Sequence, residues 1–120
     1  MKLAITSTGK ELDANLDPRF GRAAYFILVD SDTMAMEVVE NSQNLNLPQG
    51  AGIQAGKTIV DNQVEVLITG HCGPKAFKVL QQAGVKVVTG AGGTVSDAIT
   101  QFNDGELEIS AEADVEGHWV

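Results

Sequence analysis

The chain has 120 residues, 43% of them hydrophobic and 5% aromatic, which suffices for one domain with a buried core but not for two. Its 16 acidic and 8 basic residues give a formal net charge of -8, which repels nucleic acid and anionic membrane surfaces. No apolar stretch has the length of a signal peptide or a membrane span, and the single cysteine, Cys72, excludes an internal disulfide. We expect one cytoplasmic, monomeric domain.

The first part of the chain predicts a strand followed by a hairpin. Residues 3–6 are apolar or β-branched and end in a polar turn that contains glycine, as a strand does. The apolar run 25–29 predicts a second strand, and the alternating methionines and valine of residues 34–38 predict its antiparallel partner.

A loop and a helix are expected next. Residues 41–52 have no periodicity and are interrupted by glycine and proline, so they predict a loop. Apolar residues then recur at helical spacing and predict a helix. Its expected inner stripe is Ile53, Lys57, Val60 and Val64, widened by Ala55 and Ile59.

From residue 66 onward, strands and helices alternate. Residues 66–69 and 85–88 predict buried strands, and the segments that begin at Pro74 and Thr94 predict helices. Residues 103–120 form an acidic tail, with one short strand expected at Leu107 to Ile109. Two strand-helix-strand units beside a hairpin predict an α/β fold with a five-stranded mixed sheet and helices on its faces. The first strand would lie at a topological switch point, where such sheets bind ligands.

Both arginines fall in one short stretch, Arg19-Phe20-Gly21-Arg22, directly after Asp17-Pro18. Guanidinium groups keep their charge and offer a rigid set of N–H donors that suits oxyanions, phosphates and carboxylates. An acidic chain with its arginines at one turn therefore predicts an anion site. The alternative is structural: one arginine pairs with Asp17 or Asp13, and the other caps a strand end.

Glycines and hydroxyl side chains dominate the segments that follow the three strands of the parallel part. Glycine lets backbone N–H groups approach a ligand, and two of these loops enter helix N-termini, which favour negative charge. Alternatively, glycine and threonine are there because tight turns use them. The candidate anion-binding residues in these loops are Thr8, Gly70, Gly73, Gly90 and Gly92.

Gly50-Ala51-Gly52-Ile53-Gln54-Ala55 fits the dinucleotide fingerprint G-x-G-x-x-G/A. It follows a loop instead of a strand, and Thr69 and Gly70 stand where an acidic residue should bind a ribose. A dinucleotide site is therefore not expected. Gly50 and Gly52 can still present N–H groups to another ligand.

His71 and Cys72 are adjacent in one of the glycine loops, and imidazole and thiolate are the ligands that soft metals prefer. There is no second cysteine and no zinc-site spacing, so a closed structural metal site is not expected. His71 and Cys72 are candidate metal ligands. The alternative is that Cys72 is a small hydrophobic residue buried in the core. No sequence signal identifies a nucleophile with a base, and we expect no catalysis.

These motifs, in this order, resemble the dinitrogenase iron-molybdenum cofactor biosynthesis family, which includes orange-protein-like members. The resemblance covers nearly the whole chain, from Met1 to Phe102, and includes the Asp17 to Arg22 stretch, the Gly50 to Ala55 stretch and Gly70-His71-Cys72-Gly73-Pro74-Lys75-Ala76-Phe77. Where the family commonly has an apolar or small residue before Gly-Pro, this chain has Cys72, which favours direct ligation by that thiol.

The resemblance implies a three-layer, ribonuclease H-like motif and a cluster-binding domain. It also implies binding or carriage of an anionic molybdenum-containing metal-sulfide cluster, of the Mo-Fe-S or Mo-Cu-S type, in an anaerobe. A cofactor donor or acceptor protein would be the partner. Two alternatives remain: a ribonuclease H-like phosphodiesterase with carboxylate-held magnesium, and a metal-free module that binds a phosphorylated metabolite.

Overall fold

The computed structural model describes residues 1–41 and 50–110. Its elements, in chain order, are β1 (Lys2–Ser7), β2 (Tyr25–Asp30), β3 (Met36–Glu40), α1 (Ala51–Asp61), β4 (Val66–Ile68), α2 (Pro74–Gln82), β5 (Lys86–Val88) and α3 (Val95–Asn103). The strands form a five-stranded sheet in the order β3-β2-β1-β4-β5. β1 is antiparallel to β2 and parallel to β4, so the predicted mixed sheet is confirmed, with β1 between the hairpin and the parallel part.

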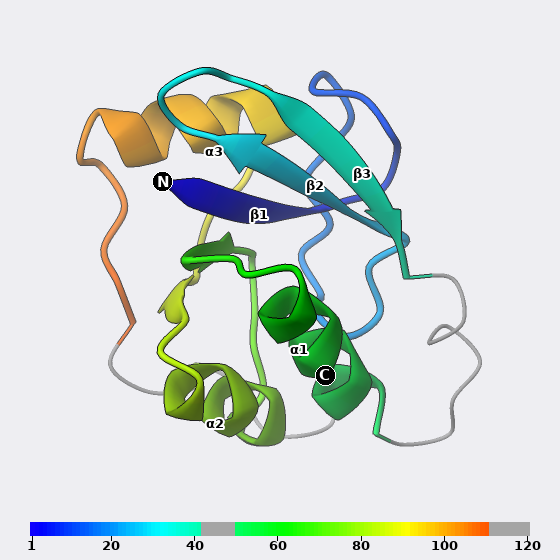
Figure 1. Ribbon diagram of the computed structural model, residues 1–120. Coiled ribbons are helices and arrows are strands. Elements are labelled where there is room, and N and C mark those ends of the chain that lie inside the picture. The colour runs from blue at the N-terminus through cyan, green and yellow to red at the C-terminus, as the bar shows by residue number, and fades with distance from the viewer. Residues whose placement is uncertain (42–49, 111–120) are drawn as a thin grey trace.

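The sheet is the middle of three layers (Figure 1), with α3 on one face and α1 and α2 on the other. Each face has its own apolar cluster: one includes Leu80 of α2, and the other includes Ile99 of α3. The inner strands β1 and β4 are buried on both faces, as in sheets covered by helices on both sides. The three-layer, ribonuclease H-like α/β architecture predicted from the sequence is confirmed. Within the described ranges, no helix has the length and apolar character that a bilayer crossing requires.

The hairpin forms as predicted, but its second strand starts at Met36 and not at Met34. Met34 lies in the turn with a positive φ of 62°. The Asp30 carboxylate stabilises this turn by accepting hydrogen bonds from the backbone N–H groups of Thr33 (3.1 Å) and Asp32 (2.8 Å). These two bonds, the one from Thr33 first, hold the pKa of Asp30 below its ordinary value.

The buried face of α1 differs from the predicted stripe. Ala55 and Ile59, which widened the predicted stripe, are buried as expected, but the other buried residues of the helix are Ala51, Gly52 and Gly56, and the helix ends before Val64. Lys57, which the predicted stripe included, is exposed. The reason is the close packing of α1 against α2, because a Cβ at Gly56 would lie 3.1 Å from Cγ1 of Val79. The small residues of α1 allow α2 to approach closely, and the apolar periodicity of the sequence does not reveal this close contact.

Part of the acidic tail is packed against the sheet. The backbone N–H of Ser110 donates to the Val87 carbonyl (2.7 Å), and Ile109 forms an isolated antiparallel bridge with Val88. The strand expected at Leu107 to Ile109 is therefore a single bridge beside β5. The remainder of the predicted tail, residues 111–120, lies outside the described residues.

Candidate functional site

The arginine turn, residues 17–22, lies in the connection between β1 and β2 and is held by a buried polar network. The Thr6 hydroxyl at the end of β1 donates to the Asp17 carbonyl (2.6 Å), and the Asp17 N–H donates back to the Thr6 carbonyl (2.9 Å). Thr6 also lies 3.0 Å from the buried hydroxyl of Thr69, which follows β4. Hydroxyls at the ends of two neighbouring strands thus fix the start of the turn.

Asp17 serves the backbone of the turn. Its side chain is 8% exposed, and Oδ1 accepts a hydrogen bond from the Arg19 backbone N–H at 3.0 Å. The structural alternative pairs one of the two arginines with Asp17 or Asp13, and Arg19 does not do so, because it forms no ion pair with any carboxylate of the described residues. Arg19 is exposed and Arg22 is half-buried. The backbone of Arg19 is therefore fixed by the turn, and its exposed side chain is accessible to an external anion.

The arginine turn is bonded directly to the loop that carries His71. The His71 N–H donates to the Pro18 carbonyl (2.7 Å), and the Phe20 N–H donates to the His71 carbonyl (3.2 Å). Arg19 and His71 are consequently paired side by side, as in a short parallel bridge. A Cβ at Gly70 would lie 2.7 Å from Cα of Pro18, so this contact requires glycine.

The remaining loops meet at the same edge, because the strands β1, β4 and β5 are parallel and end there. The Gly90 N–H donates to the Gly70 carbonyl (2.9 Å), and the Leu16 N–H donates to the Gly93 carbonyl (2.9 Å). The convergence expected from the sequence is thus present in the backbone. The hydrogen bond from Gly90 engages its own N–H, however, so that group is not a ready ligand donor.

Thr8 is also engaged locally. Both its N–H (3.0 Å) and its hydroxyl (3.1 Å) donate to the Asn15 carbonyl, although the side chain is exposed. Gly92 is exposed in the loop before α3, and a Cβ there would have no atom within 4 Å. Ligand binding by Thr8 and Gly92 stays a prediction, with Gly92 in the more open position.

Two helix N-termini in the described chain have no side-chain cap. α1 follows Gly50, in the left-handed region at φ 82°, and α2 follows Gly73; neither helix has an acidic residue in its first turn. α3, by contrast, has a complete capping box between Thr94 and Asp97. The first-turn N–H groups of α1 and α2 lack intrahelical acceptors, which makes them suitable donors to an anion. Gly50 and Gly73 thus open these helices, while Gly52 is buried within the first turn of α1.

The two candidate metal ligands are placed differently. His71 is partly exposed, next to Arg19. Cys72 is 0% exposed and belongs to the apolar cluster around Phe20 and Ala76, with its Sγ 3.7 Å from the Gly73 carbonyl. The thiol thus occupies the position of a small buried hydrophobic residue, and it could reach an external metal only after a local rearrangement. Within the described ranges, no three or more His, Cys, Asp or Glu side chains are grouped to hold a metal ion.

Sequence reasoning did not identify the role of Asn41. This residue is 1% exposed, and its amide donates to the carbonyls of Gly21 (3.2 Å) and Ala23 (2.8 Å), on either side of Arg22. Asn41 therefore holds the second half of the arginine turn, as Thr6 and Asp17 hold the first. The signal in the sequence was an amide side chain directly after the second strand of the hairpin, at the place where a loop was expected.

These features define the class of protein as a three-layer α/β domain with an arginine turn and glycine loops at the carboxyl edge of its parallel strands. The family model described as "Dinitrogenase iron-molybdenum cofactor" matches residues 1–105. The chain belongs to this family, and the resemblance inferred from the motifs is confirmed.

Solved structures with the same fold include the apo form of the orange protein from Desulfovibrio gigas. It is 44% identical, with a TM-score of 0.92, and the alignment covers 95% of this chain and 96% of that one. A Thermotoga protein described as a NifB candidate is 40% identical over 97% of this chain and 98% of its own, with a TM-score of 0.83. An uncharacterized protein of Methanocaldococcus jannaschii is 29% identical, covering 90% of this chain and 94% of that protein. A role related to cofactors follows from this membership.

Proposed function

We propose that this chain binds and carries an anionic metal-sulfide cluster of the Mo-Fe-S or Mo-Cu-S type, without catalysing a reaction on it. The observation that carries the proposal is the attachment of the arginine turn to the His71 loop by two backbone hydrogen bonds, in a member of a family named for the iron-molybdenum cofactor. That attachment places the backbone of Arg19 beside that of His71, so the cation and the imidazole extend from neighbouring positions. The family description, which names the iron-molybdenum cofactor, supports a molybdenum-containing cargo.

The donors present suit a cluster that is held by charge and hydrogen bonds. They suit a cluster held by a full set of thiolates less well. Arg19 and Arg22 would neutralise part of the negative charge, and the uncapped N-termini of α1 and α2 would donate N–H groups to sulfides. His71 is the accessible soft ligand, and Cys72 could ligate only if the core around it opened. The proposal therefore assigns first importance to the arginines and second to His71.

The wider setting belongs to the same proposal. A monomer in the cytoplasm would receive the cluster from a donor protein and pass it to an acceptor. With a formal net charge of -8, the chain must capture an anionic cargo locally, against its own average field. The arginine turn meets that need because it gathers both guanidiniums in one short stretch.

The phosphodiesterase alternative needs several carboxylates that converge at the strand ends to hold magnesium. The described strand ends carry Thr6, Ser7, Thr69 and Gly70 instead, and the Asp17 carboxylate is bonded to the Arg19 backbone. These observations favour cargo binding over hydrolysis.

The test of the proposed function is anaerobic reconstitution of purified protein with tetrathiomolybdate together with copper or iron salts. We expect a charge-transfer absorption band and stoichiometric molybdenum and sulfide after desalting, for both the wild type and Cys72→Ser. Protein that stays colourless and free of metal with every combination would contradict the proposal. Binding of inorganic phosphate by such protein would instead support the metal-free module.

A further inference from the structure

β3 is an edge strand of the sheet, and the direction of its backbone groups follows from its pairing with β2. The N–H of Asn41 donates to the Ala24 carbonyl, and the N–H of Asp30 donates to the Ala35 carbonyl, each at 3.0 Å. Hydrogen-bonded pairs alternate along an antiparallel ladder. The backbone groups of residues 36, 38 and 40 therefore point away from β2, toward the open edge.

This edge lacks several of the features that usually prevent strand addition, and its charged residues are the two carboxylates Glu37 and Glu40. Within residues 1–41 and 50–110, no backbone group is bonded to the outward N–H or carbonyl groups of Met36, Val38 and Glu40. β3 contains no proline or lysine, and its register with β2 has no bulge. The opposite edge is different, since the bridge from Ile109 covers part of β5. β3 is thus the edge that the described chain leaves available.

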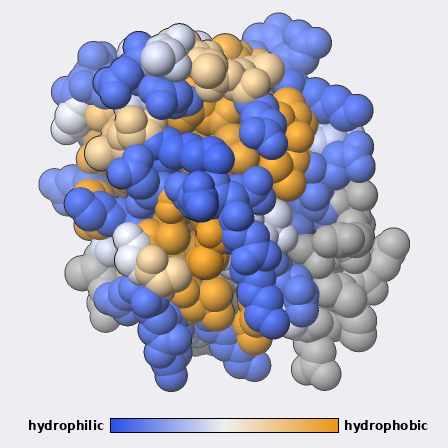
Figure 2. Space-filling model, in the orientation of Figure 1, coloured by the Kyte–Doolittle hydropathy of each residue, from blue (hydrophilic) through white to orange (hydrophobic). Residues whose placement is uncertain are grey.

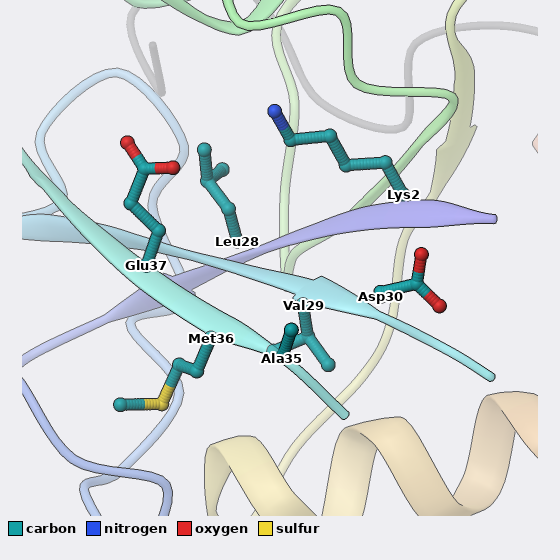
Figure 3. Close-up of a pocket in the computed structure, with 7 residues that line it drawn as sticks. All are labelled: Lys2, Leu28, Val29, Asp30, Ala35, Met36 and Glu37. Carbon is teal, nitrogen blue, oxygen red and sulfur yellow. The ribbon is translucent and has the colours of Figure 1, made fainter. Parts of the chain in front are cut away.

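Apolar side chains are exposed along the open edge. Met36 is 45% exposed, and Val38 is partly exposed beside it on the face that carries α3. Figure 3 shows Met36 pointing to one side of the hairpin and Glu37 to the other. On the face that Figure 2 displays, hydrophobic residues reach the surface between hydrophilic ones. An added strand, whose side chains alternate between the two faces, would cover part of this surface.

Two hollows that share Met36 adjoin β3, and each contains more acid than base. The one in Figure 3, of about 260 Å³, is lined by the charged residues Lys2, Asp30 and Glu37. The other, of about 480 Å³, is lined by the charged residues Lys10, Glu11 and Asp13. Each hollow thus has two carboxylates against one ammonium group, a net charge of -1. A second copy of this chain, itself carrying a net charge of -8, would be repelled, whereas a basic segment would be attracted.

We propose that β3 binds an extended segment of a partner protein as an additional strand, and that this segment alternates lysine or arginine with apolar residues. The apolar residues would lie on Met36 and Val38, and the cations, on the opposite face of the added strand, would lie near Glu37 and the hollow of Figure 3. β3 leads directly into Asn41, which holds the arginine turn, so the partner would sit beside the candidate cluster site. The inference rests on the open edge of β3, its exposed apolar side chains and the acidic residues beside it, and does not depend on cluster binding.

The experiment uses the full chain and a synthetic library of peptides of about seven residues, the length of an ordinary strand. Lysine or arginine alternates with valine, isoleucine or threonine, and a matched library has glutamate or aspartate at the basic positions. We expect selective enrichment of the basic library. NMR titration with an enriched peptide should shift and protect the amides of Met36, Val38 and Glu40, because these donors face the open edge.

Variants and a modified peptide separate strand addition from simple charge attraction. Met36→Lys should weaken binding by about tenfold or more, since a lysine on an edge strand opposes pairing and repels the basic peptide. Gln82→Lys adds the same charge at the end of α2 and should change the affinity by about twofold or less. Val38→Pro removes one outward donor. If that variant does not fold, N-methylation of alternate peptide residues removes the complementary bonds, which the peptide N–H groups would donate to the outward carbonyls of β3.

Three results would overturn the inference. The first is equal recovery of the basic and acidic libraries, or recovery of neither. The second is a set of amide shifts that lies away from residues 36–40. The third is a dimer in sedimentation experiments that Met36→Lys dissociates, because a second copy would then occupy the edge.

Discussion

At the scale of single residues, the candidate site depends on side chains that are buried and would not touch a ligand. Thr6, Asp17 and Asn41 hold the two halves of the arginine turn through hydrogen bonds between their side chains and its backbone. Gly70 permits the contact between this turn and the His71 loop. The position of the Arg19 backbone is thus determined by the residues around it. A turn that is already fixed loses less conformational entropy on binding an anion than a loose loop would.

Gly70→Ala tests this dependence. The added Cβ would lie 2.7 Å from Cα and 2.8 Å from the carbonyl oxygen of Pro18, so the turn must move. We expect the free energy of unfolding, measured by urea denaturation, to fall by about 1–3 kcal/mol. Gly92→Ala is the matched control: its Cβ would meet nothing within 4 Å, and stability should be unchanged or raised by up to about 1 kcal/mol. Equal effects of the two substitutions would count against the close packing of the turn.

At the scale of elements, short apolar runs bounded by turn residues were sufficient to predict the strands and helices, and the alternation after residue 66 predicted the parallel part of the sheet. The buried face of α1 was not predictable in this way. Its contact with α2 is made by small residues such as Gly56, which carry little hydropathy signal. Periodicity identifies a helix but not how closely its neighbour approaches.

The candidate site was predictable to a similar extent. The order of the strands brings the glycine loops to one edge, and the motifs identify the loops. Whether an individual group faces a ligand depends on its local bonding. The Gly90 N–H is engaged by Gly70, the Cys72 thiol packs in the core, and Asn41 turns inward to bind two carbonyls. Such choices depend on atomic contacts between segments distant in the chain, which no local pattern encodes.

The end of α1 provides a prediction at this scale. Gln63 has a positive φ of 59°, its N–H donates to Val60, and the Val64 N–H donates to Ile59, which is the arrangement of a Schellman motif. Glycine adopts this conformation without the steric cost of a side chain. Gln63→Gly should therefore raise the free energy of unfolding by about 0.5–1 kcal/mol.

The control for Gln63→Gly is Gln54→Gly, in the exposed part of the same helix. There the loss of helix propensity should lower stability by about 1 kcal/mol. Thermal or urea unfolding measures both variants. If Gln63→Gly is as destabilising as Gln54→Gly, the left-handed conformation at residue 63 is wrong.

At the scale of the whole molecule, an acidic chain presents one arginine-bearing edge and one acidic strand edge. The first suits an anionic cargo, and the second suits a basic partner. Asn41 lies at the end of β3 and bonds the arginine turn, so the two surfaces are neighbours. This arrangement would place a docked partner near the cargo while the remaining acidic surface limits self-association.

The most direct test of the central claim is an anaerobic titration with tetrathiomolybdate, followed by its absorption spectrum. Arg19→Gln should weaken binding by about tenfold or more, because a charge-assisted hydrogen bond to the anion is lost. Lys78→Gln, which removes an exposed positive charge from α2, should bind within about twofold of the wild type. Circular dichroism establishes that both variants fold. If Arg19→Gln binds tetrathiomolybdate as tightly as the wild type and Lys78→Gln, the arginine turn is not the site.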